Sequence, residues 1–472
     1  MSPFSTDSDR DAVALIAEWA AGTTYESLPD NVTALVKNLL LDTLGTTLAA
    51  NTLGVGCQQL LRMARSTGGS PESSLLGFPD KVPAVMAALV NGGMAHALNY
   101  DDISEGGGHM GVTTLPAALA VAEKAGGVSG KELITAVASG AELMSRLGLA
   151  VIEEQDLNNE AHPQPTQMPG YFSAALSAGR VLRLNAQQMQ SALGLAYMQA
   201  AGGRQLVLEG RPAKAIYAGF SNQGGVISAL LSLDGLEADG AIFEGTAGFF
   251  NTYYRGRYQR QALVEGLGER YSLLSAQFKP WPTTAVAHPF IEGAISLARE
   301  HDLTPNQIVS VEIYGGPELR AFCEPPETRR KPQTAVEAED SVLFAVAKAL
   351  ANREVTLDDL RPAGLRQYEA LVLSEQVRYH IEAEPARRGV ISIATTSGQT
   401  HSIQIDRPLG HPSKPLSFSD LAKKFRNCAS YSANEIHPRD LEKVIDLIEH
   451  LEDVPDVGAI PALLSGSQAV PR

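Results

Sequence analysis

The sequence predicts a mainly α-helical protein with two domains, a large all-α domain and a smaller α+β domain. Apolar residues recur at helical spacing in the first half of the chain, strand-like alternation replaces this spacing after Pro282, and helical spacing returns after Pro412. The length of 472 residues also exceeds what one hydrophobic core usually organises. The predicted boundaries are 1–270 and 405–472 for the all-α domain, and 275–400 for the α+β domain.

Two amphipathic helices are expected to begin the all-α domain. Val13, Ile16 and Trp19 share one helical face, and the same three- and four-residue spacing runs from Val32 to Leu44, with Asn31 as a candidate N-cap. Segments rich in Ala, Leu and Gly follow, and their small side chains let helices approach closely. The helices expected in these segments are 113–125, 130–148 and 172–184.

The α+β domain is predicted from alternating strands and two helices. Residues 308–314 alternate apolar and polar positions, as a half-buried strand does. Residues 389–394 and 401–405 alternate in the same way on either side of a Ser-Gly-Gln turn, which favours a hairpin. Helical spacing predicts one helix over 288–302, before the first strand, and another over 338–351, after it.

Two further helices are expected near the end of the sequence. Ser417 and Asp420 form a capping signal that starts the first of them, and apolar residues from Leu441 to Leu451 form the buried face of the second. Because helical spacing returns here, both helices are expected to pack with the all-α domain.

The charge and cysteine content exclude several classes of function. With 38 basic and 53 acidic residues, the formal net charge of −15 opposes binding to nucleic acid or to anionic lipid. The three cysteines contain no C-x-x-C pair, which argues against a disulfide framework, a structural zinc site or an iron–sulfur cluster. The N-terminal residues lack the basic and apolar regions of a secretory signal, so a cytoplasmic protein without a membrane partner is expected.

One polar cluster and two basic positions are candidates for chemistry. The cluster runs from Asn99 to His109, and its two aspartates could either orient an imidazole or cap the following helix. Lys214 follows a Gly-Arg-Pro turn, and Lys279 with His288 borders the Pro-Trp-Pro segment, although a solvated turn and a linker explain these positions as simply. Phosphate-binding glycine loops, a nucleophile elbow and a zinc pair are missing, which argues against nucleotide, flavin and zinc chemistry.

Five blocks of sequence resemble the MmgE/PrpD family, in the family's order and spacing. They are HALNYDDISEGGGHMGVTTLPAALAVAE, EGRPAKAIYAGFSNQGG, FEGTAGFF, FKPWPTTAVAHPFIEGA and PLSFSDLAKKF. That family includes 2-methylcitrate dehydratase, cis-aconitate decarboxylase and iminodisuccinate epimerase. The resemblance implies a homodimer, an α+β domain that acts as a lid, and a cofactor-independent site in the cleft between the two domains.

The resemblance also implies which residues form the site. Members of the family act on small polycarboxylates at a carbon next to a carboxylate, which requires an acid, a base and donors that stabilise the developing negative charge. At the family's site positions, the resemblance assigns a catalytic role to His109, Lys214 and Asp102, and a substrate-binding role to Lys279 and His288. His109 and Lys214 are expected to line one cleft.

Four substrate-binding positions depart from the family's pattern. Asn99, Ile103, Gln164 and Phe344 stand where other members carry an acid, an alcohol, an imidazole and a phenol. We therefore expect a lyase, either a dehydratase or a decarboxylase, that acts next to a carboxylate or carbonyl of a small and less polar organic acid. An isomerase or epimerase that uses the same carbanion is one alternative. A catalytically silent paralogue that binds an acid or a partner protein is another.

Overall fold

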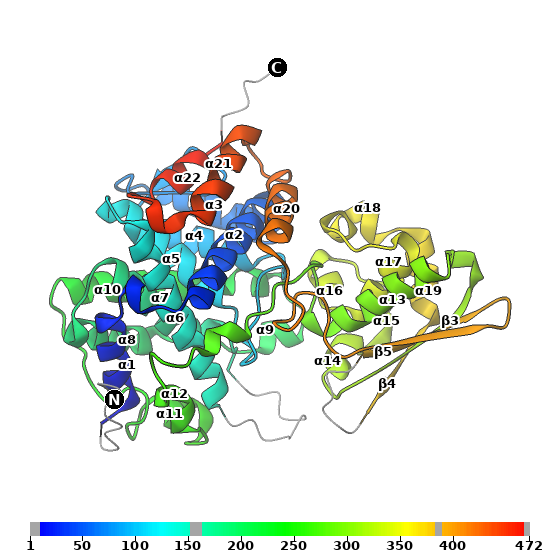
Figure 1. Ribbon diagram of the computed structural model, residues 1–472, viewed down its shortest axis with the longest axis horizontal. Coiled ribbons are helices and arrows are strands. Elements are labelled where there is room, and N and C mark those ends of the chain that lie inside the picture. The colour runs from blue at the N-terminus through cyan, green and yellow to red at the C-terminus, as the bar shows by residue number, and fades with distance from the viewer. Residues whose placement is uncertain (1–9, 152–162, 383–388, 467–472) are drawn as a thin grey trace. The chain divides into compact units, whose positions relative to one another are not determined.

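The computed structural model describes residues 10–151, 163–382 and 389–466. The chain forms two compact units, each assembled from separate segments of the sequence (Figure 1). The first unit comprises Met1–Ala97, Asp101–Ala276 and Ser417–Arg472, and the second comprises Leu98–Tyr100 and Gln277–Leu416. The first is helical apart from one two-stranded ladder and the second combines helices with a sheet, so the mainly α prediction is confirmed.

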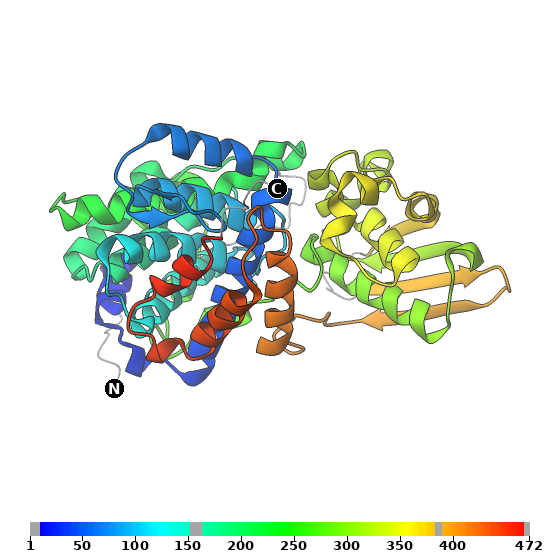
Figure 2. The same ribbon diagram turned by 90° about the horizontal axis from the view of Figure 1, so that it is seen from above.

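Five helices that pack against one another form the centre of the first unit (Figures 1 and 2). They are α4 (Ala84–His96), α5 (Met110–Ala125), α6 (Gly130–Ala150), α7 (Gln167–Val181) and α10 (Tyr217–Leu233). Small residues let them approach closely, as the sequence predicts: a Cβ atom on Gly140 of α6 would lie 2.0 Å from the Ser177 hydroxyl of α7, and one on Gly225 would lie 2.4 Å from the Cβ of Ala174.

The other elements of the first unit surround these five helices. They are α1 (Ala12–Gly22), α2 (Asp30–Leu53), α3 (Cys57–Thr67), β1 (Ser73–Ser74), β2 (Lys81–Val82), α8 (Ala186–Gln199), α9 (Gln205–Leu208), α11 (Phe249–Tyr254), α12 (Arg260–Val264), α20 (Phe418–Ala429), α21 (Pro438–Glu449) and α22 (Ala459–Leu463). The predicted cap at Asn31 is wrong, because α2 already begins at Asp30 after Pro29. The capping box of Ser417 and Asp420 is confirmed at the start of α20.

Helix α6 carries a buried ion pair. By length and composition α6 is apolar enough to cross a membrane, but 89% of its most apolar stretch is buried within the protein, as in a core helix. On this helix Arg146 Nε donates to Glu142 at 2.5 Å, and both side chains are almost fully buried. The rest of the Arg146 guanidinium donates to backbone carbonyls between Ala262 and Arg270, so the pair ties α6 to the segment around α12.

The second unit contains a four-stranded sheet with the order β4-β3-β5-β6. Its strands are β3 (Ile308–Gly315), β4 (Val377–Ile381), β5 (Gly389–Thr395) and β6 (Thr400–Ile405). Strands β3 and β4 are parallel, whereas β3–β5 and β5–β6 are antiparallel, which confirms the predicted hairpin. Alternate residues such as Val311 and Ile391 pack with Phe290 and Val346 of the helices in one hydrophobic core.

Helices α13 (His288–Glu300), α17 (Val342–Asn352) and α19 (Tyr368–Gln376) accompany the sheet, with the short helices α14 (Leu319–Cys323), α15 (Pro326–Arg330), α16 (Ala335–Glu339) and α18 (Pro362–Leu365). The helix predicted over 338–351 is confirmed from Val342 onward, but its predicted start is wrong, because the chain breaks between α16 and α17. Ser341 causes the break by accepting the backbone N–H of Phe344 as the N-cap of α17.

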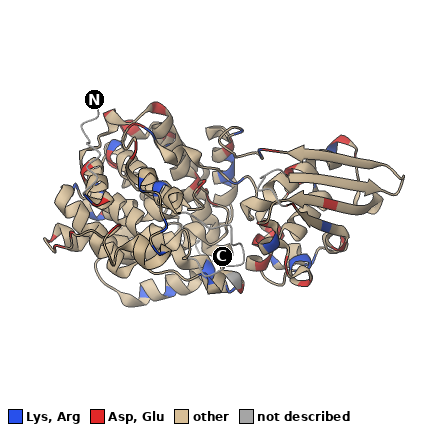
Figure 3. Ribbon diagram, turned by 90° about the horizontal axis from the view of Figure 1, so that it is seen from below, with Lys and Arg blue, Asp and Glu red and all other residues tan. Residues whose placement is uncertain are grey.

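Basic and acidic residues are mixed with one another (Figure 3), whereas the cysteines are buried. Across the described residues, Lys and Arg are interspersed with Asp and Glu (Figure 3). No disulfide joins the three cysteines that the structure describes, and all three are buried, Cys57 in α3, Cys323 in α14 and Cys428 in α20. Burial raises the pKa of Cys323 and Cys428 to about 12, so both thiols stay protonated at neutral pH.

Candidate functional site

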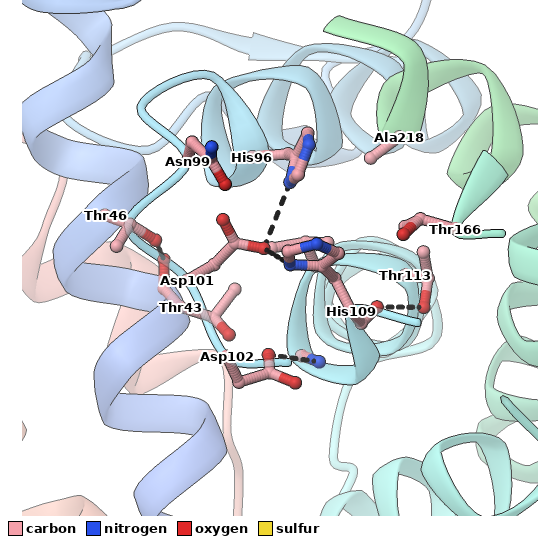
Figure 4. Close-up of polar contacts among 12 residues, drawn as sticks. Thr43, Thr46, His96, Asn99, Asp101, Asp102, His109, Thr113, Thr166 and Ala218 are labelled. Carbon is pink, nitrogen blue, oxygen red and sulfur yellow. Dashed lines mark hydrogen bonds and ion pairs between the residues drawn. The ribbon is translucent and has the colours of Figure 1, made fainter. Parts of the chain in front are cut away.

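The loop that joins α4 to α5 brings two histidines to one buried aspartate (Figure 4). His96 is the last residue of α4 and His109 is the N-cap of α5. The loop is held against α6 by its glycines: a Cβ on Gly106 would lie 2.9 Å from the Cα of Gly148, and one on Gly108 would lie 2.6 Å from Met144. Packing therefore explains Gly106 and Gly108.

Asp101 contacts both imidazoles through the same oxygen. Its Oδ2 lies 2.7 Å from Nδ1 of His109 and 3.0 Å from Nδ1 of His96, and the Asp101 side chain is fully buried. The two imidazoles meet edge to face with 4.7 Å between ring centroids. Burial by itself would raise the pKa of Asp101, but the two imidazoles outweigh it and hold this pKa well below its usual range. Asp101 is therefore an anion at neutral pH.

This arrangement fixes the tautomer of His109. A carboxylate only accepts hydrogen bonds, so Nδ1 of His109 carries the proton that faces Asp101. The other ring nitrogen, Nε2, is then the atom that can accept or donate a proton in a reaction. The side chain of His109 is 10% exposed, so it exchanges protons in a largely dry environment.

Asp102 has a different role from its neighbour. Its two carboxylate oxygens each lie 2.9 Å from the backbone N–H groups of Met110 and Gly111, so it caps the first turn of α5. Gly111 allows this contact, because a Cβ there would lie 2.2 Å from the Thr43 hydroxyl and 2.9 Å from Asp102. The resemblance placed Asp102 in the catalytic set. In the structure, Asp101 takes the place beside the imidazole and Asp102 is a helix cap.

Asp102 gives the protein a pH-dependent stability. Burial and the nearby charge of Asp101 raise the pKa of Asp102 from 3.8 to about 7. A raised folded-state pKa stabilises the fold below about pH 4, and that stability is lost as the pH rises through 7. The asparagine of Asp102→Asn cannot ionise, so this variant should not lose stability in this way. The unfolding free energy of Asp102→Asn minus that of wild type should therefore increase by about 2 kcal/mol when the pH is raised from about 5.5 to about 8. Urea unfolding at both pH values measures this; a difference that stays constant with pH would contradict it.

A second contact anchors the start of α5. Pro116 inside α5 has no N–H to donate to the carbonyl of Val112, and Asn222 of α10 donates to that carbonyl at 2.8 Å instead. The Asn222 side-chain oxygen also accepts the N–H of Ala117 at 3.0 Å. The helix turn that carries His109 is thus fixed to α10 by a side chain that replaces the missing backbone bond.

Helix α10 also brings Tyr217 and the Lys214 segment to this region. Tyr217 begins α10, and its ring centroid lies 4.6 Å from that of His96. Lys214 lies three residues earlier, half-buried in the short helix η2 (Pro212–Ile216), which packs against α4. The structure therefore places the segments of His96, His109 and Lys214 together in the first unit.

Gln164 and Thr166 precede α7. Gln164 is buried, and its side-chain oxygen accepts the N–H of Thr166 at 2.6 Å, immediately before α7. Thr166 is 1% exposed, and its hydroxyl has no hydrogen-bond partner among the described residues. Figure 4 shows this hydroxyl on the side of His109 away from Asp101. Ile103 lies half-buried in the loop before His109.

The remaining predicted residues lie in the second unit. Lys279 is 2% exposed and its ammonium donates to the backbone and side-chain oxygens of Asn99, at 2.8 and 2.6 Å. Asn99 donates in turn to Asp340 at 3.2 Å and adopts a left-handed backbone with φ of 48°, which asparagine tolerates. His288 is buried with its ring against Trp281, and Phe344 is buried in α17 with Lys348 5.8 Å from its ring centroid.

His96, Asp101 and His109 also form a group of potential metal ligands, with ligand atoms within 4.8 Å of one another. It is the one such group among the described residues. A shared cation would have to take the place of the protons between these atoms. His96 forms a hydrogen bond with Asp101 at 3.0 Å and His109 forms an ion-pair contact with it at 2.7 Å, so we interpret the three side chains as a directly paired cluster.

Sequence reasoning did not select His96, Thr166 or the role of Asp101. His96 ends an Ala-rich apolar helix and has no polar neighbour in sequence before Asn99. The available signal was its spacing: a histidine in the last turn of a helix, five residues before an aspartate, lies within reach of that aspartate when the chain turns back. No sequence pattern identified Thr166.

Comparison with known proteins matches most of the chain to one family. A model of the MmgE/PrpD N-terminal domain matches residues 14–261, and one of the MmgE/PrpD C-terminal domain matches residues 281–450. The chain is similar to cis-aconitate decarboxylase of Mus musculus, with 26% identity over 462 residues covering 94% of this chain and 91% of that protein. The Homo sapiens enzyme of that name is 26% identical over 455 residues, covering 93% and 91%, and the Aspergillus terreus one is 24% identical over 492 residues, covering 96% and 97%. The chain therefore belongs to the MmgE/PrpD family and is an enzyme of lyase type.

Proposed function

We propose that this protein is a cofactor-independent lyase that removes CO2, or alternatively water, from a small organic acid with fewer carboxylates than cis-aconitate. The observation that carries the proposal is the buried contact of His109 with Asp101, which leaves Nε2 of His109 as a proton carrier. The names of the relatives favour decarboxylation over dehydration.

His109 would act as the acid of the decarboxylation. The bond between the reacting carbon and its carboxylate breaks, CO2 leaves, and the electron pair stays on the carbon, where the adjacent carboxylate or carbonyl delocalises it. The imidazolium of His109 then transfers its Nε2 proton to that carbon, while Asp101 stabilises the imidazolium through Nδ1. In a dehydration, neutral Nε2 would instead take the proton next to the carboxylate, and hydroxide would leave as water after protonation.

The developing negative charge needs donors near His109. Lys214 is proposed as the anchor of the substrate's carboxylate, because η2 packs against the helix that ends at His96. The buried hydroxyl of Thr166 is a further donor, and substrate oxygen would satisfy a group that otherwise has no partner among the described residues. The substrate-binding roles that the resemblance implies for Lys279 and His288 remain proposals.

Lys214→Ala should mainly weaken substrate binding. Loss of one charge-assisted hydrogen bond of about 1.5–3 kcal/mol corresponds to a KM about 10 to 150 times higher, with a smaller effect on kcat. Steady-state kinetics on the acid that the wild type consumes measure both. Lys131→Ala, which removes an exposed lysine paired with Glu26, is the control. An unchanged KM in Lys214→Ala would remove Lys214 from the site.

The proposal of a less polar substrate is based on the four substituted positions. The side-chain oxygens of Asn99 and Gln164 already accept protein donors, and Ile103 and Phe344 offer no polar atom. A second or third carboxylate of a citrate-like acid would lack partners here, and each missing contact costs about 1.5–3 kcal/mol. The acid that this protein consumes is thus proposed to have one or two carboxylates.

We therefore expect negligible turnover of cis-aconitate and 2-methylcitrate. The assay incubates the protein with each acid, and with a panel of unsaturated and hydroxylated mono- and dicarboxylic acids, and follows CO2 release and alkene absorbance. Exchange of substrate hydrogen for deuterium without CO2 or alkene formation would identify an isomerase or epimerase instead. Turnover of cis-aconitate at about 1 s⁻¹ or faster would contradict the substrate argument.

Three further expectations remain proposals. A homodimer is supported by the number of exposed apolar side chains on α8, α9 and α10, which are Met198, Leu206, Phe220, Leu231 and Leu233. A reducing cytoplasmic location is supported by the three buried cysteines that the structure describes, which no disulfide joins. The negative charge of −15 supports partners other than nucleic acid and anionic membranes.

A further inference from the structure

His96 lies beside the proposed catalytic pair, although the mechanism above gives it no task. Its Nδ1 reaches the same Asp101 oxygen as His109, its ring touches the His109 ring, and its side chain is only 9% exposed. Because the His96 imidazole also contacts Asp101, the negative charge of this carboxylate acts on both imidazoles and not on His109 alone. We propose that His96 is a positioning residue that makes the His109 imidazolium a stronger acid, by sharing Asp101 and by holding positive charge next to it.

The helix ends give the two imidazoles opposite environments. His96 is in the last turn of α4, where the partial negative charge of the carbonyl end stabilises an imidazolium. His109 is at the first turn of α5, where the partial positive charge of the amide end destabilises one. The two helix ends therefore favour positive charge at His96 and disfavour it at His109. His109 then faces both a positively charged neighbour and a carboxylate whose charge is already shared.

Asp102 reinforces this difference. Its carboxylate caps α5 beside His109, and an ionised cap would offset the positive helix end. Burial and Asp101 raise the pKa of Asp102 to about 7, so its negative charge is only partly present at neutral pH. The amide end of α5 thus keeps much of its effect on His109.

Other ionisable groups near the cluster are mostly paired. On the elements packed against α4 and α5 they are Asp42 of α2 in an ion pair with Lys424, Glu142 with Arg146 of α6, Lys214 of η2, Tyr217 of α10, the exposed Arg62 and Arg65 of α3, and Glu123 and Lys124 at the far end of α5. Lys214 would act in the same direction as His96, because a second cation also disfavours an imidazolium at His109. Variants at His96 are therefore compared with Lys214 intact.

Two substitutions separate the two contributions of His96. The amide nitrogen of asparagine can take the place of Nδ1, so His96→Asn keeps a donor to Asp101 and removes the positive charge. His96→Phe keeps a ring against Tyr217 and removes both the donor and the charge. His450→Asn, which changes an exposed histidine elsewhere, is the matched control.

The test measures the titration of His109 by NMR, using 13C-labelled histidine and assigning the His109 signal by its loss in His109→Asn. The pH at which His109 titrates should rise by about one unit in His96→Asn and further in His96→Phe, the size of shift that a helix-end or neighbouring charge produces. It should not move in His450→Asn. No shift, or a downward shift, in His96→Asn would overturn the inference. If His96→Phe does not fold, His96→Asn still decides the result.

The inference rests on the proposed role of His109, but the NMR titration needs no substrate, so the two can fail separately. With an active substrate, the limb of the pH–rate profile that belongs to His109 should move to higher pH by the same amount. A limb on the alkaline side identifies the imidazolium as the reacting form and favours proton donation to carbon. A limb on the acidic side identifies the neutral imidazole and favours proton abstraction. A limb that stays fixed while the NMR titration moves would exclude His109 as the proton carrier.

Discussion

His109→Ala is expected to lower turnover by a factor of about 10² to 10⁴, the usual contribution of a positioned acid or base. The fold should persist, because His109 is the N-cap residue of α5 but its side chain makes no capping hydrogen bond. The carboxylate of Asp102 caps the first turn of α5 instead. The measurement is kcat on the acid that the wild type consumes. Circular dichroism and the urea midpoint verify that the variant is folded.

Two comparisons make this result specific. His437→Ala removes an exposed histidine at the start of α21 and should retain wild-type turnover. Asp101→Asn keeps the shape of the carboxylate but no longer fixes the Nδ1 proton of His109, so it should lose activity to a similar extent. Wild-type turnover in His109→Ala would exclude this histidine from the mechanism.

Arg146→Ala should destabilise the first unit by about 3–5 kcal/mol, because it leaves the carboxylate of Glu142 buried without its counter-ion. The backbone carbonyls between Ala262 and Arg270 that accept from the guanidinium would lose their donor at the same time. Urea unfolding followed by circular dichroism measures the loss.

Arg183→Ala is the matched control for this variant. Arg183 also pairs with a glutamate, Glu132, but its side chain is 73% exposed, so the expected change is about 1 kcal/mol or less. A double variant, Arg146→Met with Glu142→Leu, removes both charges together and should recover part of the stability. Equal losses in Arg146→Ala and Arg183→Ala would show that burial of the ion pair has no energetic consequence.

The helices were predictable because their apolar spacing is repeated over several turns. The limits of prediction appear where a single contact decides the structure. The start of α17 was predicted four residues too early, because Ser341 caps the helix at Val342. Strand β4 was missed because the five residues that pair with β3 carry too short a pattern. In both places tertiary contacts or local capping outweigh periodicity.

The site was predictable in part for a similar reason. The Gly-rich loop and its aspartates drew attention to His109, but two adjacent aspartates with the same residue type took different roles. Asp102 points to the amide groups of α5 and Asp101 to the imidazoles, and this depends on how the loop turns between two helices. His96 joins the cluster only through this turn, so no pattern local to α4 identified it.

The three buried cysteines supply internal reporters of opening in each unit. A protonated, inaccessible thiol does not react with an alkylating reagent until the surrounding structure opens, so the rate of labelling measures the population of open forms. Cys57 and Cys428 report on the first unit and Cys323 on the second. Pulsed alkylation followed by mass spectrometry can therefore compare how often the two units open in the same molecule. No residue of the histidine cluster has to be changed to do so.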